Sequence, residues 1–147
     1  MLARRKQMQE YIALGSDVDI LNEIGKWKVI PLKGLYESLN QPMLYNGFGK
    51  RVQILERAGL VRGFARKKTK YLVLTHDGSR VSKYCNYYDE NEDFLNHDLN
   101  AANVLRQLLT FENFKDGHMF HDDKEEVDPD AVIHAVRGGR KYTLAIE

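Results

Sequence analysis

The sequence predicts an α+β fold, in which a helix-rich first half ends in a β-hairpin and a second half combines a helix with another hairpin. Apolar side chains recur every three to four residues through most of residues 3–58, the period of helices with one buried face. Residues 61–75 and 131–147 are instead rich in β-prone residues around short turns. With 147 residues, the chain suits one compact core or two small ones and is too short for a multidomain enzyme.

The composition excludes several protein classes. With 11 Gly, 3 Pro and one Cys, the chain is not collagen-like, low-complexity or a disulfide scaffold. The basic residues near the start are not followed by an apolar run, which argues against a signal peptide. No stretch approaches the about 18–20 apolar residues of a membrane helix. We therefore expect a soluble, cytoplasmic protein.

The net charge of +1 hides a strong charge asymmetry along the chain. Residues 1–85 contain 16 Lys and Arg against 7 Asp and Glu, a net charge of +9. Residues 86–147 contain 6 against 14, a net charge of −8. A positive field of this size attracts phosphate, whereas the negative half repels it. Nucleic-acid binding, if present, is therefore expected in the first 85 residues.

Four helices are expected in the first 58 residues. Gly15 should end the first, Ser16 or Asp17 should cap the second, and Gly25 should stop it. A short extended piece, residues 27–30, leads to Pro31, which suits the first turn of the third helix. Residues 40–47 are expected to form a loop. The helices are then expected at residues 3–14, 17–24, 31–39 and 47–58.

The segment 47–58 carries the sharpest functional signal. At 100° per residue, its apolar and polar side chains fall on opposite sides of a helix. The apolar side consists of Phe48, Val52, Leu55 and Gly59, and the polar side consists of Asn46, Lys50, Gln53 and Arg57. One side can pack while the other holds residue types that contact DNA bases, so we expect this helix to enter the major groove.

A basic hairpin follows this helix. Residues 61–66 and 70–75 are β-prone and are joined by Lys67, Lys68 and Thr69, and a short helix is expected at residues 77–85. Helices followed by a basic hairpin in this order are typical of a winged helix-turn-helix. The residues expected to contact DNA are Asn46, Lys50, Arg51, Gln53, Arg57, Arg62, Arg66, Lys67, Lys68 and Lys70.

The second half is predicted to be a separate, acidic segment. The polar run at residues 86–93 is expected to be a linker between a DNA-binding domain at residues 1–85 and an acidic segment at residues 94–147. That segment should contain a helix at residues 94–109 and a β-hairpin around the Gly138–Gly139 pair. The chain stops at Glu147, inside the last strand, which predicts either a truncated chain or a missing sheet.

Several short motifs resemble the replication-relaxation family. They are AGLVRGF and YLVLTHDG around the hairpin, LNHDLNAANV at residues 95–104, PDAVI at residues 129–133, and the final LAIE. The resemblance covers roughly residues 5–147. It implies a winged-helix DNA-binding protein of plasmids or mobile elements that acts in replication and mobilisation, with a partial restriction-endonuclease-like core in its second half.

In such a core, a PD motif and a downstream acid hold a divalent metal. By position, Asp130 and Glu147 match these two acids, and carboxylates suit Mg²⁺. No Lys follows Glu147, so the family's catalytic pattern is incomplete. We therefore expect no catalytic residues, metal or cofactor, and Asp130 and Glu147 are kept only as candidate metal ligands.

Two groups that contain histidines are not expected to be sites. His97 and Asp98 are adjacent on a helix, so they point about 100° apart. We expect Asp98 or Asn96 to cap this helix and His97 to form a hydrogen bond with a packed surface. His118 and His121, with the acids that follow, lack a recognised zinc spacing.

The sequence thus favours a non-enzymatic protein that binds double-stranded DNA at a plasmid or mobile-element origin. The alternatives are a winged-helix transcriptional regulator, a metal-dependent nuclease using Asp130 and Glu147, and a protein-interaction module. Protein partners could bind the acidic half. A homodimer is also considered, although no heptad helix is visible.

Overall fold

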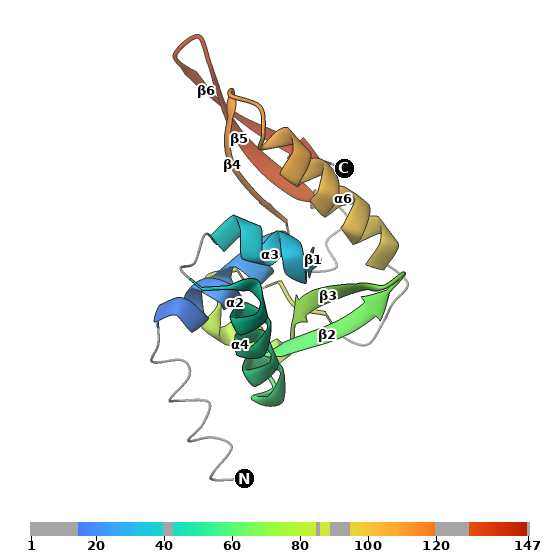
Figure 1. Ribbon diagram of the computed structural model, residues 1–147. Coiled ribbons are helices and arrows are strands. Elements are labelled where there is room, and N and C mark those ends of the chain that lie inside the picture. The colour runs from blue at the N-terminus through green and yellow to red at the C-terminus, as the bar shows by residue number, and fades with distance from the viewer. Residues whose placement is uncertain (1–14, 40–42, 85, 89–94, 120–129, 147) are drawn as a thin grey trace.

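The computed structural model describes residues 15–39, 43–84, 86–88, 95–119 and 130–146 (Figure 1). The helix expected at residues 3–14 lies outside these ranges. The first part contains α2 (Gly15–Trp27), β1 (Ile30–Pro31), α3 (Leu32–Leu39), α4 (Tyr45–Arg57), β2 (Val61–Arg66), β3 (Thr69–Leu74) and α5 (His76–Val81). The second contains α6 (Leu95–Leu108), β4 (Phe114–Met119), β5 (Ala131–Arg137) and β6 (Arg140–Ile146).

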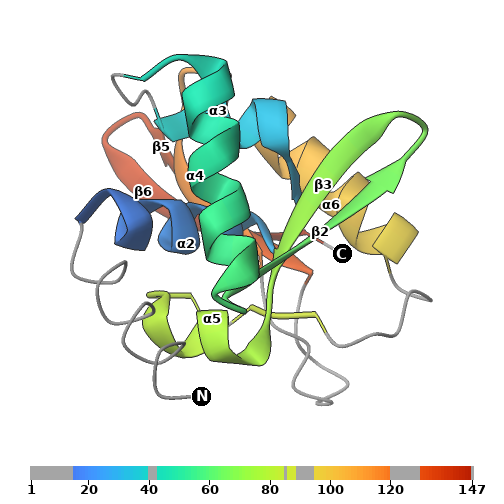
Figure 2. The same ribbon diagram turned by 60° about the horizontal axis from the view of Figure 1, so that its bottom comes forward.

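The first part has the arrangement of a winged helix. Helices α2, α3 and α4 pack together, and β1, β3 and β2 form a small antiparallel sheet in that order. Strands β2 and β3 pair from Val61 opposite Leu74 to Arg66 opposite Thr69, which makes the wing hairpin. Figure 2 shows α4 on the surface with this hairpin beside it. The α+β class and the winged-helix order predicted from the sequence are therefore confirmed.

Several predicted boundaries are wrong, and the largest error concerns Gly25. Helix α2 begins at Gly15 and continues through Gly25 to Trp27. A Cβ atom at position 25 would lie 2.5 Å from Ser82 Oγ and 2.8 Å from the Tyr84 carbonyl oxygen. The glycine therefore permits close packing of the chain after α5 on α2, and does not end the helix.

Other helix ends differ by a few residues from the expectation. Helix α4 begins at Tyr45 rather than at residue 47, and Pro31 lies in β1, directly before α3. Helix α5 is shorter than expected and ends at Val81. Its start is well defined, because the Thr75 side chain accepts a hydrogen bond from the Gly78 amide.

The second part consists of α6 and a three-stranded antiparallel sheet, ordered β4, β5, β6. Helix α6 and the β5–β6 hairpin were both predicted. Strand β4 was missed, because its sequence FKDGHM lacks an alternating apolar pattern. It borders β5 from Phe114 opposite Ala135 to Met119 opposite Ala131. The hairpin extends away from the winged helix (Figure 1).

The two parts share one hydrophobic core. Buried residues of the winged helix, among them Ile24 and Leu35, cluster with Leu105, Met119 and Ile133 of the second part. The buried Asn86 side chain strengthens this junction by donating hydrogen bonds to the carbonyl oxygens of Gly25 and Met119, at 2.7 and 2.8 Å. The expected domain boundaries at residues 85 and 94 stay a prediction, but the parts are packed as one body.

The described helices also bear on the membrane question. Not one of them combines the length and the apolar character that crossing a bilayer requires.

Candidate nucleic-acid interface

Helix α4 presents the polar face that the sequence predicts. Its buried side chains are Phe48, Val52 and Leu55, all facing the core. Its exposed side chains include Asn46, Lys50, Gln53 and Arg57, which are three or four residues apart and so form one row along the helix. Helix α4 itself stands in front of the other helices in Figure 2.

The beginning of α4 adds two residues that the sequence analysis placed in a loop. Leu44 is 83% exposed and Tyr45 is also largely exposed, although both are large apolar residues. Leu44 occupies the N-cap position, and its side chain makes no capping hydrogen bond. Among the described residues, a Cβ added at Gly47 or Gly49 would meet nothing within 4 Å. This end of α4 is therefore open to a partner, and the signal that could have revealed it is an apolar pair directly before the polar row.

The wing places two lysines at its tip. Lys67 and Lys68 form the two-residue turn between β2 and β3 and have positive φ angles of 50° and 65°. Such a turn matches the twist of the strands, so the hairpin stays tight up to its end. Both lysines are exposed. The tip of the wing therefore carries a compact positive charge.

Helix α6 supports the wing from the side. Leu99 packs with Val29 and Val73, and the partly buried Phe64 and Tyr71 join this cluster. The rings of Phe64 and Tyr71 stack on the same face of the hairpin, with centroids 5.8 Å apart. The hairpin is therefore braced by the second part of the chain.

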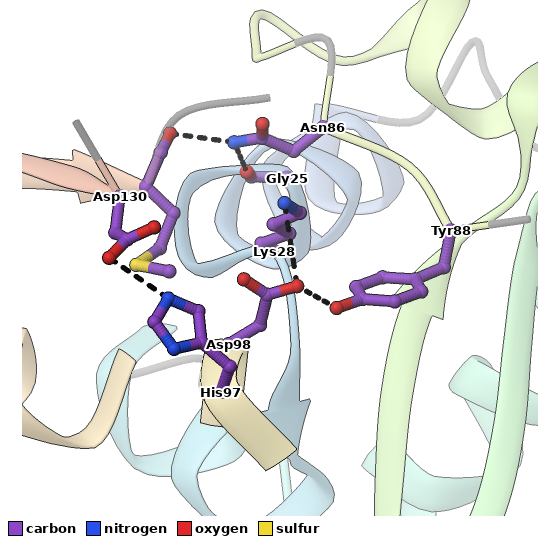
Figure 3. A network of polar contacts seen from close by, with 8 residues as sticks. Gly25, Lys28, Asn86, Tyr88, His97, Asp98 and Asp130 are labelled. Atoms are coloured by element: carbon purple, nitrogen blue, oxygen red, sulfur yellow. Dashed lines mark hydrogen bonds and ion pairs between the residues drawn. The ribbon is translucent and has the colours of Figure 1, made fainter. Parts of the chain in front are cut away.

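A buried polar network joins the same elements (Figure 3). Lys28, which follows α2 with a positive φ of 67°, forms an ion pair with Asp98 of α6 at 3.4 Å. The Tyr88 hydroxyl donates a hydrogen bond to the same carboxylate. Asp98 is the fourth residue of α6, so the prediction that it caps this helix is wrong. Its role is to connect α6 with the segment between α2 and β1.

Two residues of the predicted DNA-contacting set are engaged inside the protein. Arg51 donates hydrogen bonds to both carboxylate oxygens of the fully buried Asp17, at 2.7 and 2.9 Å. Lys70 of the wing forms an ion pair with Glu56 of α4. These pairs fix α4 to α2 and to the wing. They also neutralise the charges of Asp17 and Glu56.

Arg62 and Arg66 lie on the face of the hairpin that is turned away from α4. A Cβ at Gly63 would point at Glu56 of α4, 3.0 Å from Oε2, and side chains alternate along a strand. Arg62 pairs with Val73, whose side chain packs on Leu99. Both arginines are partly buried and have contacts within the protein. A role for them in DNA binding stays a prediction.

Of the two candidate metal ligands, the structure describes Asp130 alone, and it does not place Asp130 in a metal site. Asp130, just before β5, forms an ion pair with His97 of α6 at 2.9 Å, and Glu147 lies outside the described ranges. No group of three potential His, Cys, Asp or Glu ligands occurs among the residues that the structure describes. The contact of His97 agrees with the expected hydrogen bond to a packed surface.

Among the described residues, Arg106 and His118 have shifted pKa values, and both lie outside the α4–wing surface. Burial lowers the pKa of His118 on β4, although nearby Asp116 opposes the shift. Burial also lowers the pKa of Arg106 on α6, against the opposing effect of Glu37. These groups belong to the packing of the second part on the winged helix.

Comparison with known proteins gives one similar structure. No family model matches the chain, and no curated protein matches it in sequence. A solved structure of an ArsR-family transcriptional regulator is similar to it, with a TM-score of 0.47 and 12% sequence identity. The similarity covers 75% of this chain and 93% of the regulator.

Proposed function

We propose that this protein binds double-stranded DNA, with α4 in the major groove and the wing tip on the phosphate backbone. The observation that carries the proposal is the exposed row of Asn46, Lys50, Gln53 and Arg57 on α4, together with the exposed Lys67–Lys68 turn of the wing. Winged helices place the corresponding helix and hairpin against a duplex in this manner.

The charges on this surface support a polyanionic partner. Lys50, Arg57, Lys67 and Lys68 are exposed, and within the described ranges none of them forms an ion pair with an acid. Glu56, the acid on α4 itself, is already paired with Lys70. Four positive charges therefore face outward without an opposing negative charge, which favours phosphate binding.

The proposal assigns different roles to the two elements. Gln53 can form paired hydrogen bonds with an adenine edge, and Lys50 or Arg57 can do so with guanine. Lys67 and Lys68 lie at the end of a hairpin and would contact phosphates, which adds affinity without sequence preference. Leu44 and Tyr45, at the exposed start of α4, would offer apolar contact to thymine methyl groups.

The biological setting is a separate question from the DNA contact. The same row of side chains suits an origin-binding protein of a plasmid or mobile element and a transcriptional regulator. The replication role rests on the short motifs shared with the replication-relaxation family alone. We therefore propose site-specific DNA binding as the function, and mapping the bound sites in the source genome would decide between origin and promoter.

The test is a salt titration of the full chain against a duplex of about three helical turns and a single strand of equal length. With Lys67 and Lys68 on phosphates, log Kd should change with log salt by a slope of about 1.8, and the duplex should bind more tightly. Absence of duplex binding at low salt, or equal binding of both nucleic acids, would refute the proposal.

A further inference from the structure

Strand β6 leaves one edge of the second sheet open. In the order β4, β5, β6, the last strand pairs with β5 on one side, and within the described part of the chain no strand pairs with its other side. All of its residues from Arg140 to Ala145 are exposed. The hairpin stands out from the rest of the molecule (Figure 1). An open edge of this length is a template for pairing with another strand.

Apolar side chains gather beside this edge. Of the six large apolar residues that are exposed in the described chain, three lie on β6 or α6. They are Tyr142 at 44%, Leu144 at 43% and Val104 at 46% exposure. Natural edge strands are usually protected by charges or proline. Here, the centre of the strand carries Tyr, Thr, Leu and Ala instead.

The two groups belong to one surface. On β5, the buried residues Ala135 and Ile133 lie opposite Tyr142 and Leu144, respectively. Ile133 packs in the same hydrophobic cluster as Leu105 of α6. Tyr142 and Leu144 therefore lie on the face of the sheet that α6 covers. His97 of α6 forms an ion pair with Asp130, directly before β5, so the side of α6 that carries His97 faces the start of β5. Val104 follows His97 by seven residues, two helical turns, and so lies on that same side. The surface thus runs from α6 to the open edge.

We propose that a second copy of this chain covers this surface, with the two β6 strands pairing antiparallel about Thr143. The β5–β6 turn has two residues, Gly138 and Gly139, with φ angles of 59° and 77°. In such a hairpin the flanking residues, Arg137 and Arg140, form a hydrogen-bonded pair, and the pattern alternates along the strand. The backbone groups of residues 141, 143 and 145 therefore point to the open edge.

This register is self-complementary. Thr143 lies opposite Thr143 of the second copy, and residues 141 and 145 pair through their outward backbone groups. Tyr142 then lies opposite Leu144 of the second copy in a non-hydrogen-bonded pair, where side chains approach most closely. Each copy supplies both members, so the contact closes with twofold symmetry.

The charges select the antiparallel arrangement over the parallel one. Arg140 and Lys141 stand at one end of β6, and Asp130 borders the other end, where its amide donates to the Ile146 carbonyl oxygen at 2.8 Å. Antiparallel pairing brings Arg140 opposite Ile146 and toward Asp130 of the second copy. Parallel pairing in register would instead place Arg140 and Lys141 beside Arg140 and Lys141 of the second copy. Such like-charge pairs are destabilising.

The dimer is tested without DNA, so its failure is distinguishable from failure of the proposed function. The mass of the full chain is measured by light scattering during size-exclusion chromatography. Wild type should be a dimer, and Leu144→Lys should be a monomer at the same concentration. Asn103→Lys adds the same charge at an exposed position of α6, about 100° around the helix from Val104, and it should stay dimeric. A monomeric wild type, or a dimeric Leu144→Lys variant, would overturn the proposal.

The register is tested by cross-linking. In a background with Cys85 replaced by Ser, Thr143→Cys should form a disulfide-linked dimer on mild oxidation, because hydrogen-bonded antiparallel partners lie about 5.5 Å apart at Cα. Asn103→Cys should remain unlinked. A dimer in which position 143 does not cross-link, or in which both variants do so equally, would contradict the β6 pairing.

Discussion

The Arg51 guanidinium holds the buried Asp17 carboxylate through two hydrogen bonds, Nε to Oδ1 at 2.7 Å and Nη2 to Oδ2 at 2.9 Å. The two residues are 34 positions apart and join α4 to α2. The planar guanidinium matches both oxygens, which Lys could not do. The helix proposed to enter the major groove is thereby fixed by a contact on the side opposite to its exposed row.

Replacing Arg51 should therefore act on stability. Arg51→Ala leaves the Asp17 charge buried without its partner and should lower the free energy of unfolding by about 3–5 kcal/mol. Chemical denaturation followed by circular dichroism measures the loss. The double variant Arg51→Ala/Asp17→Ala removes the orphaned charge and should be more stable than Arg51→Ala alone. Equal stability of the two variants would show that the pair is not coupled.

Residues of α4 and of the wing should differ in their effect on sequence preference. Gln53→Ala should cost about 1–3 kcal/mol on a selected site and little on random DNA, because it removes a base contact. Lys68→Ala should weaken both duplexes alike and reduce the salt slope by about one. Fluorescence anisotropy on the two duplexes separates these patterns. If both variants behave identically, α4 is not the element that distinguishes sequences.

Gly47 and Gly49 should show opposite effects on stability and binding. Neither glycine has a packing neighbour that a methyl group would meet, and helical Gly is about 1 kcal/mol less favourable than Ala. Gly47→Ala and Gly49→Ala should therefore raise the free energy of unfolding. They should weaken DNA binding if the start of α4 closely approaches the duplex. The control is Asn103→Ala, at an exposed position of α6, which should gain stability without losing DNA affinity. Unchanged DNA affinity in the two glycine variants would show that the start of α4 does not contact the duplex.

His118 should make stability depend on pH. Burial lowers the pKa of its imidazole from 6.5 in the folded protein, while Lys26, Lys83 and His134 also disfavour its charge and Asp116 favours it. The unfolded chain then binds more protons just below pH 6.5, so stability is complete above that pH and falls as the pH drops toward the lowered value. Thermal unfolding of His118→Gln should depend less on pH across this window. Identical pH profiles for the two proteins would refute the assignment.

The sequence was most informative where the period of apolar residues was regular. The row on α4 and its buried counterpart Phe48 follow directly from helical spacing. The wing hairpin was found from β-prone residues around a lysine turn, and Gly138–Gly139 marked the second hairpin. These features are local, so a single sequence is enough to locate them.

The remaining features depend on contacts between distant segments. Gly25 looked like a helix end, but it is required by the approach of Ser82 and Tyr84. Strand β4 has no apolar alternation and is defined by its pairing with β5. The ion pairs of Arg51 and Lys70 likewise join separate elements, so the charge pattern alone could not distinguish them from free cations such as Lys50.

The most direct test of the α4 interface compares two double variants with the same change in charge. Lys50→Ala/Arg57→Ala alters the exposed row, whereas Lys115→Ala/Arg137→Ala alters exposed positions of the second sheet, away from α4 (Figure 1). Anisotropy titrations with one duplex at fixed salt should show at least about a tenfold loss of affinity for the first variant. The second should bind as wild type does. Equal affinities of the two variants would contradict the placement of DNA on α4.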